Sequence, residues 1–570
     1  MPMDKKELEK HIRVAALENA IKFNGKPSQG AVIGKLFSID QDLKRQMKEI
    51  SPLISEIISE TEKLSLEEQK RRLIELDPEF DEREKSKKEE RKKAARELPP
   101  LKDAEEGKVV TRMPPGPSKY PHIGHAISFG INYLYAREYN GKCILRFDDT
   151  NPEVEKQEFV DANMEDITEY LGFKPDSIVY ASDSMDRIYN YIDELIHGGN
   201  IYACSCPPEN IAESRKNMKA CEHRTQSIDE TKRIWKEMKN GKSNGFALRL
   251  KIDMTHKNAV MRDPVIARVI TTPHYRQKDK YKVWPTYDFE SPIIDGINGI
   301  THVLRSNEFD SRIELHHYIS KLLGFPEIPY KHYGRVNITG SLTQGRVIRE
   351  KIDNGEFIGW DDPRLVTLKA LRRRGITREA IINIVKMAGL SKQATNIDFS
   401  VIAAENRKIL DASAKRFFFI EEPKEIDVKN APNQEITLKS HPDSDKRERK
   451  FKTDGKFMIE KKDYDDMEEG KLSRLMDCFN IIKKRDGSIE FYSEELKDYK
   501  KKGKSIMHWL PKEGNINAEI VMPDGTRKKG LAEHNTKKLE KGAVIQFERF
   551  GFCILDAIEK GKLTFWYTHD

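Results

Sequence analysis

Three features are scarce in this sequence: cysteine, long apolar runs and an excess of either charge. Six cysteines in 570 residues are too few to form a disulfide framework. No apolar run approaches the roughly 18 to 20 residues that cross a bilayer, and the mixed charges of the N-terminal stretch do not fit a signal peptide. These absences predict a cytoplasmic protein with reduced cysteines.

Charged residues of both signs are abundant. Lysine and arginine total 101 against 94 acidic residues, which gives a formal net charge of +7. This small excess permits a polyanionic partner such as nucleic acid but does not require one. Apolar residues make up 37% of the chain, as in a globular protein, and the length is too great for one hydrophobic core. We therefore expect about three to five domains.

The N-terminal part is predicted to be helical. Apolar residues recur at helical spacing in residues 8–23 and again in residues 41–60. Between them, residues 24–37 contain the glycine and proline of a loop. The almost purely charged stretch 81–108, which contains a Pro-Pro pair, is either an exposed helix or a linker, and we expect a domain boundary there.

From residue 108 the pattern changes to that of an α/β protein. KVVTRM (108–113) is a short apolar strand, PPGPSKYP (114–121) is a loop because prolines exclude regular structure, and residues 122–139 read as a helix. GKCILRFDDT (141–150) is a second strand. Strand, helix and strand at this spacing form a βαβ unit, which predicts a parallel sheet.

Later segments divide into three types. Residues 200–285 hold a cysteine cluster, a charged helix and short strands, and they look like an insertion into the sheet domain. Residues 363–410 read as helices again. Beyond Lys415 the strands are short, apolar and separated by turn residues, a pattern that suits β-barrels.

The motif PHIGHA stands where the proline loop meets the helix, at residues 121–126. A helix start at the carboxyl edge of a parallel sheet binds phosphate through its free N–H groups. Gly124 lets a flat purine approach the backbone, and His122 and His125 can donate hydrogen bonds to phosphate oxygens. Two surface histidines on a helix are the alternative interpretation.

The motif's surroundings resemble the class I aminoacyl-tRNA synthetases, specifically the glutamyl and glutaminyl group. VVTRMPPGPSKYPHIGHA and ILRFDDTNPE carry the resemblance, which continues through YDFESPIIDGINGITHVLRSNEF and GWDDPRLVTLKALRRRGI. It covers residues from about 108 to 570. The β-rich C-terminal region is similar to that of the archaeal and eukaryotic branch.

The resemblance implies a multidomain α/β fold built on a Rossmann-type catalytic domain. It divides the chain into an N-terminal helical region with a charged linker (1–100), a first Rossmann half (101–200), an inserted acceptor-end-binding domain (201–285), a second Rossmann half (286–350), a helical connector (351–414) and anticodon-binding β-barrels (415–570).

It also implies a reaction and its residues. The glutamate carboxylate attacks the α-phosphorus of ATP, with Mg²⁺ on the phosphates, and a ribose hydroxyl of tRNA then takes the glutamyl group. The residues implied as catalytic are His122 and His125. Those implied for ATP are Pro114, His122, Gly124, His125 and Arg346, and those for glutamate are Arg112, Ser118, Asp148, Tyr287 and Arg305.

Individual roles and their alternatives differ within this set. Asp148 is expected to hold the α-amino group of the substrate, although it also fits a turn at the end of a strand. Tyr287 also fits a core aromatic. Arg305 is expected to face the side-chain carboxylate of glutamate, whereas a bridge to Glu308 is the structural alternative. A glutaminyl enzyme would have an uncharged residue at position 305.

One motif departs from the family pattern. The second phosphate-binding loop reads GSLTQGRVIREKI, and Gly345 stands where the family's lysine is expected. Arg346, Arg349 or Lys351 are candidates to supply the missing charge. A catalytically silent tRNA-binding relative is therefore a second alternative, although the retained histidines argue against it.

The cysteine cluster predicts a structural zinc site. Cys204 and Cys206 are followed, after fourteen intervening residues, by Cys221 and His223. Three thiolates and one imidazole form a complete tetrahedral set, whereas three reduced, buried cysteines are the alternative. The expected partners are tRNA(Glu) and glutamate, and charging of tRNA(Gln) stays open.

Overall fold

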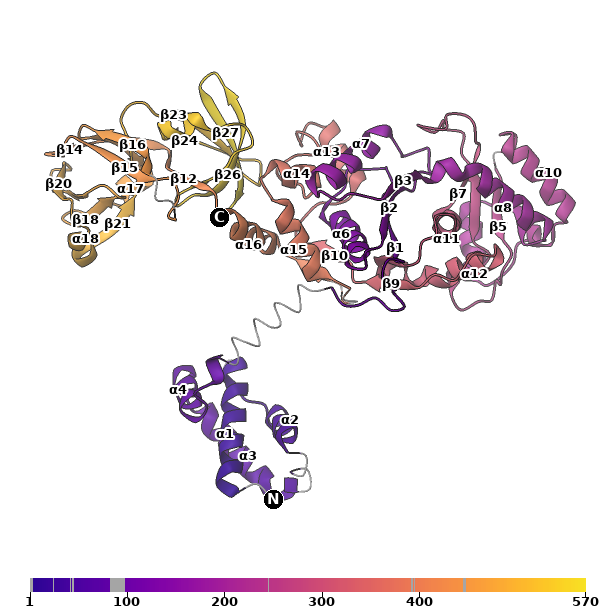
Figure 1. The fold of residues 1–570 in the computed structure, drawn as a ribbon, viewed down its shortest axis with the longest axis horizontal. Coiled ribbons are helices and arrows are strands. Elements are labelled where there is room, and N and C mark those ends of the chain that lie inside the picture. Colours follow the sequence, from indigo (N-terminus) through magenta and orange to yellow (C-terminus); the bar gives the residue numbers. More distant parts are fainter. Residues whose placement is uncertain are drawn as a thin grey trace. The chain divides into compact units, whose positions relative to one another are not determined.

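The computed structural model describes residues 4–23, 25–40, 43, 46–82, 98–243, 245–390, 393, 395–443 and 447–570. The chain divides into two compact units, Met1–Glu97 and Leu98–Asp570. Figure 1 draws both units, and each is described by itself below.

In the described part of the N-terminal unit, four helices surround a small apolar core. They are α1 (Lys5–Lys22), α2 (Gln29–Ile39), α3 (Met47–Glu62) and α4 (Leu66–Leu76).

The loop prediction for residues 24–37 is wrong from Gln29 onward. Val32 and Leu36 are four residues apart and both fully buried, so their burial stabilises a helix despite the nearby glycines. The charged segment 83–97 lies outside the described residues.

The larger unit begins with the predicted βαβ arrangement. Strands β1 (Val110–Met113), β2 (Lys142–Phe147) and β3 (Ser177–Tyr180) are parallel, and α6 (Ile123–Glu138) connects the first two. Helix α7 (Gln157–Glu165) continues into a π-helical turn, Asp166–Tyr170. The parallel pair β8 (Val303–Ser306) and β9 (Tyr330–Tyr333) lies beside β1, so the carboxyl ends of these strands share one edge.

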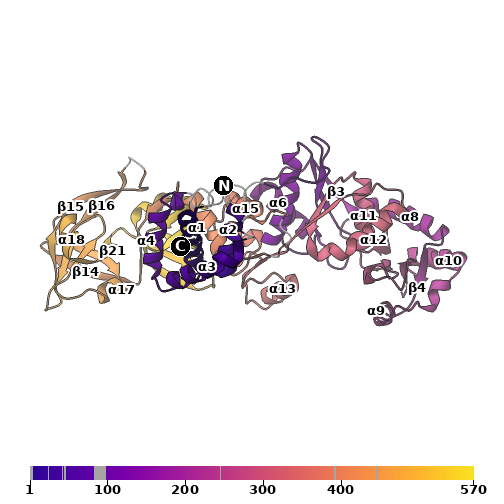
Figure 2. The ribbon, with the colours of Figure 1, turned by 90° about the horizontal axis from the view of Figure 1, so that it is seen from below.

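An antiparallel sheet interrupts the parallel strands. It consists of β4 (Ile201–Cys204), β5 (Ala247–Leu250), β6 (Val265–Val269) and β7 (Val283–Pro285), accompanied by α8 (Met185–His197), α9 (Pro208–Lys216) and α10 (Ile228–Lys239). The chain then returns through α11 (Tyr287–Ile297) and α12 (Ile313–Leu322). Both views place α8 and α10 beyond α11 and α12, away from α6 (Figures 1 and 2).

Helices connect the parallel strands to the C-terminal strands. After β10 (Val336–Ile338) come α13 (Gly345–Asp353), α14 (Leu368–Arg373), α15 (Arg378–Ala388), β11 (Thr395–Ile397) and α16 (Phe399–Leu410). Helix α15 packs against α6, where Gly130 allows a close approach. A Cβ atom at Gly130 would lie 2.7 Å from the Val385 side chain.

In the described part of residues 415–570, the strands form two seven-stranded mixed sheets and one hairpin. The first sheet runs β12 (Lys415–Phe417), β25 (Val544–Phe547), β26 (Gly551–Glu559), β27 (Lys562–His569), β23 (Ile516–Val521), β24 (Arg527–Ala532) and β13 (Phe419–Glu421). The second runs β21 (Gly503–Met507), β18 (Leu472–Leu475), β19 (Asn480–Lys483), β20 (Ile489–Ser493), β14 (Pro423–Lys429), β17 (Lys456–Glu460) and β22 (Leu510–Pro511). The hairpin pairs β15 (Gln434–Lys439) with β16 (Arg447–Thr453), and α17 (Lys461–Asp465) and α18 (Leu496–Lys502) are short helices.

Both large sheets curl almost into barrels. The edge strands of the first sheet, β12 and β13, are neighbours in the chain and are separated by Phe418 alone. The edge strands of the second, β21 and β22, are also neighbours in the chain. A sheet whose two edges are joined by so short a segment must close on itself.

The predicted fold class, with a parallel-sheet domain and C-terminal barrels, is confirmed. Within the described ranges, the helices are too short or too polar to cross a membrane.

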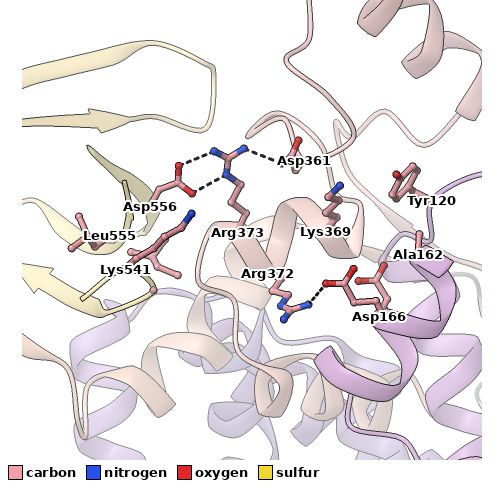
Figure 3. A pocket seen from close by; sticks show the side chains of 13 residues that line it. Tyr120, Ala162, Asp166, Asp361, Lys369, Arg372, Arg373, Lys541, Leu555 and Asp556 are labelled. Atoms are coloured by element: carbon pink, nitrogen blue, oxygen red, sulfur yellow. Dashed lines mark hydrogen bonds and ion pairs between the residues drawn. The ribbon is translucent and has the colours of Figure 1, made fainter. Parts of the chain in front are cut away.

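A network of ion pairs fastens the connector to the first C-terminal sheet. Figure 3 shows Arg373, at the end of α14, between Asp556 on β26 and Asp361. Its guanidinium donates to Asp556 at 2.9 and 2.7 Å and to Asp361 at 2.9 Å. These contacts lie at one side of a cavity of about 590 Å³.

Replacing Arg373 by alanine is expected to lower the free energy of unfolding by about 2 kcal/mol, because two carboxylates lose a charged hydrogen-bond partner. Arg372, on the same helix, pairs with the half-exposed Glu165, so Arg372→Ala should cost only about 0.5 kcal/mol. Denaturant unfolding of both variants measures the difference. Equal losses of unfolding free energy in the two variants would contradict the conclusion that Arg373 holds the helices to the first C-terminal sheet.

Candidate active site

A cavity of about 420 Å³ opens at the carboxyl ends of the parallel strands. Side chains from the ends of β1, β2, β8 and β9 and from the starts of α6 and α11 line it. The sequence-predicted residues that line it are Arg112, Pro114, His122, Gly124, His125, Asp148, Tyr287 and Arg305. Ser118 and Arg346 are not among the lining residues, and Arg346 is exposed at the start of α13.

The two histidines form the N-terminal cap of α6. The Nδ1 atom of His122 accepts from the Gly124 amide at 3.1 Å, and the Nδ1 atom of His125 accepts from the His122 amide at 3.1 Å. A neutral imidazole that accepts at Nδ1 carries its proton on Nε2. Both rings therefore have an Nε2–H donor that is not used by the cap. A Cβ atom on Gly124 would lie 2.9 Å from the His122 ring, so a larger residue would displace it.

Both histidines are neutral at physiological pH. Burial, reinforced by the charges of Lys119 and Arg335, lowers the pKa of His122 to about 3. Burial also holds the pKa of His125 well below its usual value. The pair can therefore donate hydrogen bonds to an anion but contributes no positive charge.

A buried ionic cluster lies behind the wall of the cavity and contributes Arg112 and Asp148 to its lining. The Arg112 guanidinium donates to Asp295 at 2.9 Å, and Arg146 donates to Asp295 at 2.5 Å and to Asp148 at 2.6 Å. Burial opposes ionisation of Asp295, but Arg112 and Arg146 outweigh it and keep its pKa below the usual value. Burial raises the pKa of the neighbouring Glu290 well above the usual value, and Asp148 reinforces the shift. Within the described part of the chain, the Nη1 atom of Arg112 has no hydrogen-bond partner.

Arg305 is the second guanidinium at the cavity, and it is 5% exposed. It donates to the Tyr287 hydroxyl at 3.0 Å and to His332 Nε2 at 3.0 Å. Among the residues that the structure describes, no carboxylate forms an ion pair with Arg305. The alternative bridge to Glu308 is absent there, since Glu308 contacts Ser306 at 2.8 Å and Arg335 at 3.5 Å.

Sequence reasoning did not select several lining residues. Lys119 belongs to the proline loop, Arg335 follows β9, and Glu308 and Phe309 follow β8. A signal for Lys119 was present, because it stands two residues before the histidine motif. Arg335 could be found only from the strand order, which brings the ends of β8 and β9 to one edge.

The cysteine cluster is assembled as predicted. One ligand atom from each of Cys204, Cys206, Cys221 and His223 lies within 4.8 Å of all the others. The Cys204 and Cys221 sulfur atoms are 3.8 Å apart, which is about the edge of a tetrahedron with 2.3 Å Zn–S bonds. His223 Nδ1 faces the sulfurs, 3.5 Å from Cys206. The donor set and its spacing fit a zinc ion.

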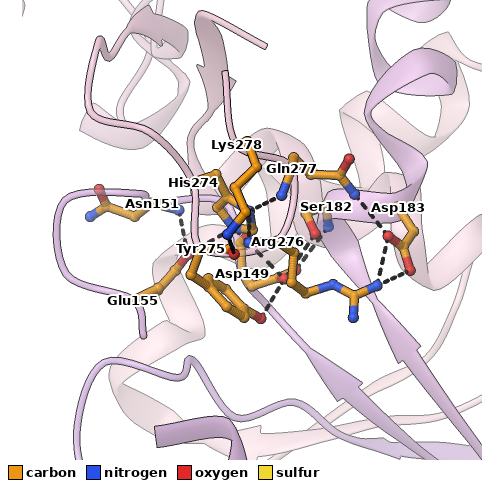
Figure 4. A network of polar contacts seen from close by, with 10 residues as sticks. All are labelled: Asp149, Asn151, Glu155, Ser182, Asp183, His274, Tyr275, Arg276, Gln277 and Lys278. Atoms are coloured by element: carbon orange, nitrogen blue, oxygen red, sulfur yellow. Dashed lines mark hydrogen bonds and ion pairs between the residues drawn. The ribbon is translucent and has the colours of Figure 1, made fainter. Parts of the chain in front are cut away.

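Asp149, next to Asp148, points away from the cavity into a separate polar network (Figure 4). It accepts hydrogen bonds from the Ser182 amide, the Ser182 hydroxyl and the Tyr275 hydroxyl, each at 2.8 Å. His274 Nε2 lies 3.1 Å from the Asp149 carbonyl oxygen. Because residues 274–275 belong to the β6–β7 connection, this network ties the inserted sheet to the end of β2.

Comparison with known proteins agrees with this fold and cavity. A family model for "tRNA synthetases class I (E and Q), catalytic domain" matches residues 108–412. Two models for the anti-codon binding domain of the same synthetases match residues 414–493 and 506–556. The chain therefore belongs to the class I tRNA synthetases of the E and Q group.

The relatives that match the chain over nearly its whole length are named for glutamate. Proteins named glutamate–tRNA ligase from Pyrococcus furiosus, Pyrococcus horikoshii and Methanocaldococcus jannaschii are 39%, 40% and 37% identical to the chain. Each comparison covers 99% of this chain and 100% of the relative.

Glu155, in the network beside Asp149, predicts a pH effect. Burial raises its pKa from 4.5 to about 8, so the folded state holds this proton more tightly than the unfolded state does. The resulting stability is complete below about pH 4.5 and is lost as the pH rises through about 8. Glu155→Gln, which cannot ionise, should therefore gain stability relative to wild type from pH 5 to pH 9.

Thermal unfolding followed by circular dichroism at pH 5, 7 and 9 measures this gap. The exposed Glu153 provides the matched control, as Glu153→Gln. A melting-temperature difference that stays constant across the three pH values would show that Glu155 is ionised in the folded protein.

Proposed function

We propose that the chain ligates glutamate to tRNA through a glutamyl-adenylate, with AMP and pyrophosphate as the other products. The observation that carries this proposal is the charge of the buried residues in and behind the cavity wall. Three guanidinium groups, of Arg112, Arg146 and Arg305, stand against the two carboxylates of Asp148 and Asp295. Glu290 adds no charge while it is protonated.

Glutamate matches this excess of one positive charge. Its two carboxylates and one ammonium carry a net charge of −1, whereas glutamine carries none. The ammonium fits Asp148, whose carboxylate lies at the cavity, and the free Arg112 Nη1 can receive a carboxylate. Arg305 has no acidic partner among the described residues, so it can bind the other carboxylate. A neutral amide would leave its guanidinium buried without a counter-charge, which costs several kcal/mol.

The ATP phosphates are assigned to the start of α6. The Nε2–H groups of His122 and His125 and the helix N-terminus all favour an anion. The substrate carboxylate is already ionised, so the first step needs positioning and charge stabilisation rather than a base. Mg²⁺ that accompanies ATP would neutralise phosphate charge. Pro114 and Gly124 complete the wall on this side, while contacts of Ser118 and Arg346 with the substrates remain predictions.

Transfer RNA is assigned to the rest of the large unit. The two near-barrels, residues 415–570, fall in the region matched by the anti-codon binding models, and the inserted sheet, residues 201–285, is proposed to bind the acceptor end. The remaining proposed domains are the N-terminal helical region with its linker (1–100), the two Rossmann halves (101–200 and 286–350) and the helical connector (351–414). The expected substrate is tRNA(Glu), and charging of tRNA(Gln) remains open.

A structural zinc ion is proposed for the inserted sheet. Cys204, Cys206, Cys221 and His223 would fill all four positions, so the ion would hold the two ends of the segment together rather than bind substrate. Arg249 lies 3.7 Å from the Cys221 sulfur, where its charge would stabilise thiolates.

Arg305→Met tests the glutamate assignment. Loss of the guanidinium should lower kcat/KM for glutamate activation by about 10³-fold and weaken the discrimination against glutamine. ATP–pyrophosphate exchange with tRNA present measures both amino acids, and Arg378→Met, an exposed arginine on α15, is the control. Wild-type protein that activates glutamine better than glutamate would overturn the assignment.

Zinc binding gives a second prediction. Purified protein should contain about one zinc per chain by elemental analysis, and Cys221→Ser should lose it and become more sensitive to proteolysis around residues 204–223. Cys553→Ser is the control, because Cys553 is buried in the C-terminal sheet far along the chain. Metal-free native protein with freely reactive thiols would rule out the site.

A further inference from the structure

Lys119 lies at the edge of the active-site cavity, and its ammonium group has no hydrogen-bond or ion-pair partner among the described residues. It lines the cavity together with His122 and Arg335. Two of the other cations there are already paired, Arg112 with Asp295 and Arg335 with Glu308 at 3.5 Å, while Arg305 donates to Tyr287 and His332. In the described part of the chain, no hydrogen bond or ion pair joins Lys119 to another residue.

The surroundings of Lys119 favour an anion. Burial and the nearby Arg335 lower its pKa, while Glu308 acts in the opposite direction. Two like charges held beside a partly desolvated cavity repel one another, and an anion placed between them would remove that penalty. The adjacent donors are the Nε2–H groups of the neutral histidines, which also suit an anion but bring no charge of their own.

Lys119 also lies beside the position that lacks a lysine. A Cβ atom built on Gly345 would be 3.4 Å from both Cβ and Cδ of Lys119. A side chain at residue 345 would therefore begin in van der Waals contact with the Lys119 side chain. Arg346, the next residue, is exposed and is not among the cavity-lining residues.

We propose that Lys119 is a catalytic residue that binds the phosphate chain of ATP, supplying from the proline loop the positive charge that position 345 lacks. The inference rests on the proposed function and names a further residue of the same site. As the glutamate carboxylate forms its bond to the α-phosphorus, the bond between that phosphorus and the bridging oxygen breaks. The electron pair stays on pyrophosphate, and the Lys119 ammonium stabilises the charge without giving up a proton.

Nucleotide binding tests this role independently of the amino acid. Lys119→Met should weaken ATP binding by about tenfold or more, since a charged hydrogen bond is lost, while binding of adenosine, which has no phosphates, should be unchanged. Lys331→Met is the matched control, because Lys331 is exposed on β9 and is not among the lining residues. Calorimetry with each ligand, without glutamate or tRNA, measures the effect.

A rescue experiment tests the position of the charge. Lys119→Ala should slow glutamate-dependent pyrophosphate exchange by at least about tenfold, and adding Gly345→Lys to this variant should restore a large part of the rate. The alanine removes the Lys119 atoms beyond Cβ, so the new side chain has room to enter the cavity. Gly345→Lys alone should not speed the wild-type reaction.

The outcomes separate the two proposals. Unchanged ATP affinity in Lys119→Met, or an equal loss of ATP and adenosine binding, would overturn the role of Lys119 whatever the amino acid is. Weakened ATP binding in Lys119→Met, with a wild type that does not activate glutamate, would support Lys119 and reject the glutamate assignment. Failure of Gly345→Lys to restore any rate to Lys119→Ala would also count against a charge placed at this position.

Discussion

The catalytic part depends on one buried ionic cluster. Asp295 on α11 accepts from Arg112 on β1 and Arg146 on β2, and Arg146 also holds Asp148. Charges buried this deeply stabilise a fold only when they are paired, and removal of one partner is costly. The same constraint therefore joins two strands to a helix from beyond the inserted segment and sets the side chains that face the cavity. In these four residues, the demands of the fold coincide with those of the proposed substrate binding.

The cavity combines two kinds of electrostatic environment. At the start of α6, the Nε2–H groups of two neutral histidines offer donors without formal charge. At the ends of β1 and β8, guanidinium groups exceed the carboxylates. The first environment suits phosphate oxygens, whose charge is shared with a metal ion, and the second suits a dicarboxylic amino acid. A single edge of a parallel sheet brings them together, because all its strands end on the same side.

Local patterns predicted much of the fold. The βαβ unit at residues 108–150, the inserted strands and the C-terminal barrels follow from alternation, apolar runs and turn residues, and the predicted family membership and fold class are confirmed. The segment 24–37 was mispredicted, because glycine and proline suggested a loop while burial of Val32 and Leu36 stabilises α2. Intrinsic propensity is weak, and the packing of one helix face outweighs it.

The sequence by itself determined the chemistry of the site: the paired histidines, the strand-end acids, Arg305 and the four metal-ligand candidates. These residue types and spacings are local, so they can be recognised along the chain. Only the tertiary structure decided which of them share a cavity, because that depends on strand order and burial. It placed Lys119 and Arg335 among the residues that line the cavity, and it left Arg346 exposed outside the cavity. It also separated Asp149 from Asp148, since consecutive side chains at a strand end point to opposite sides.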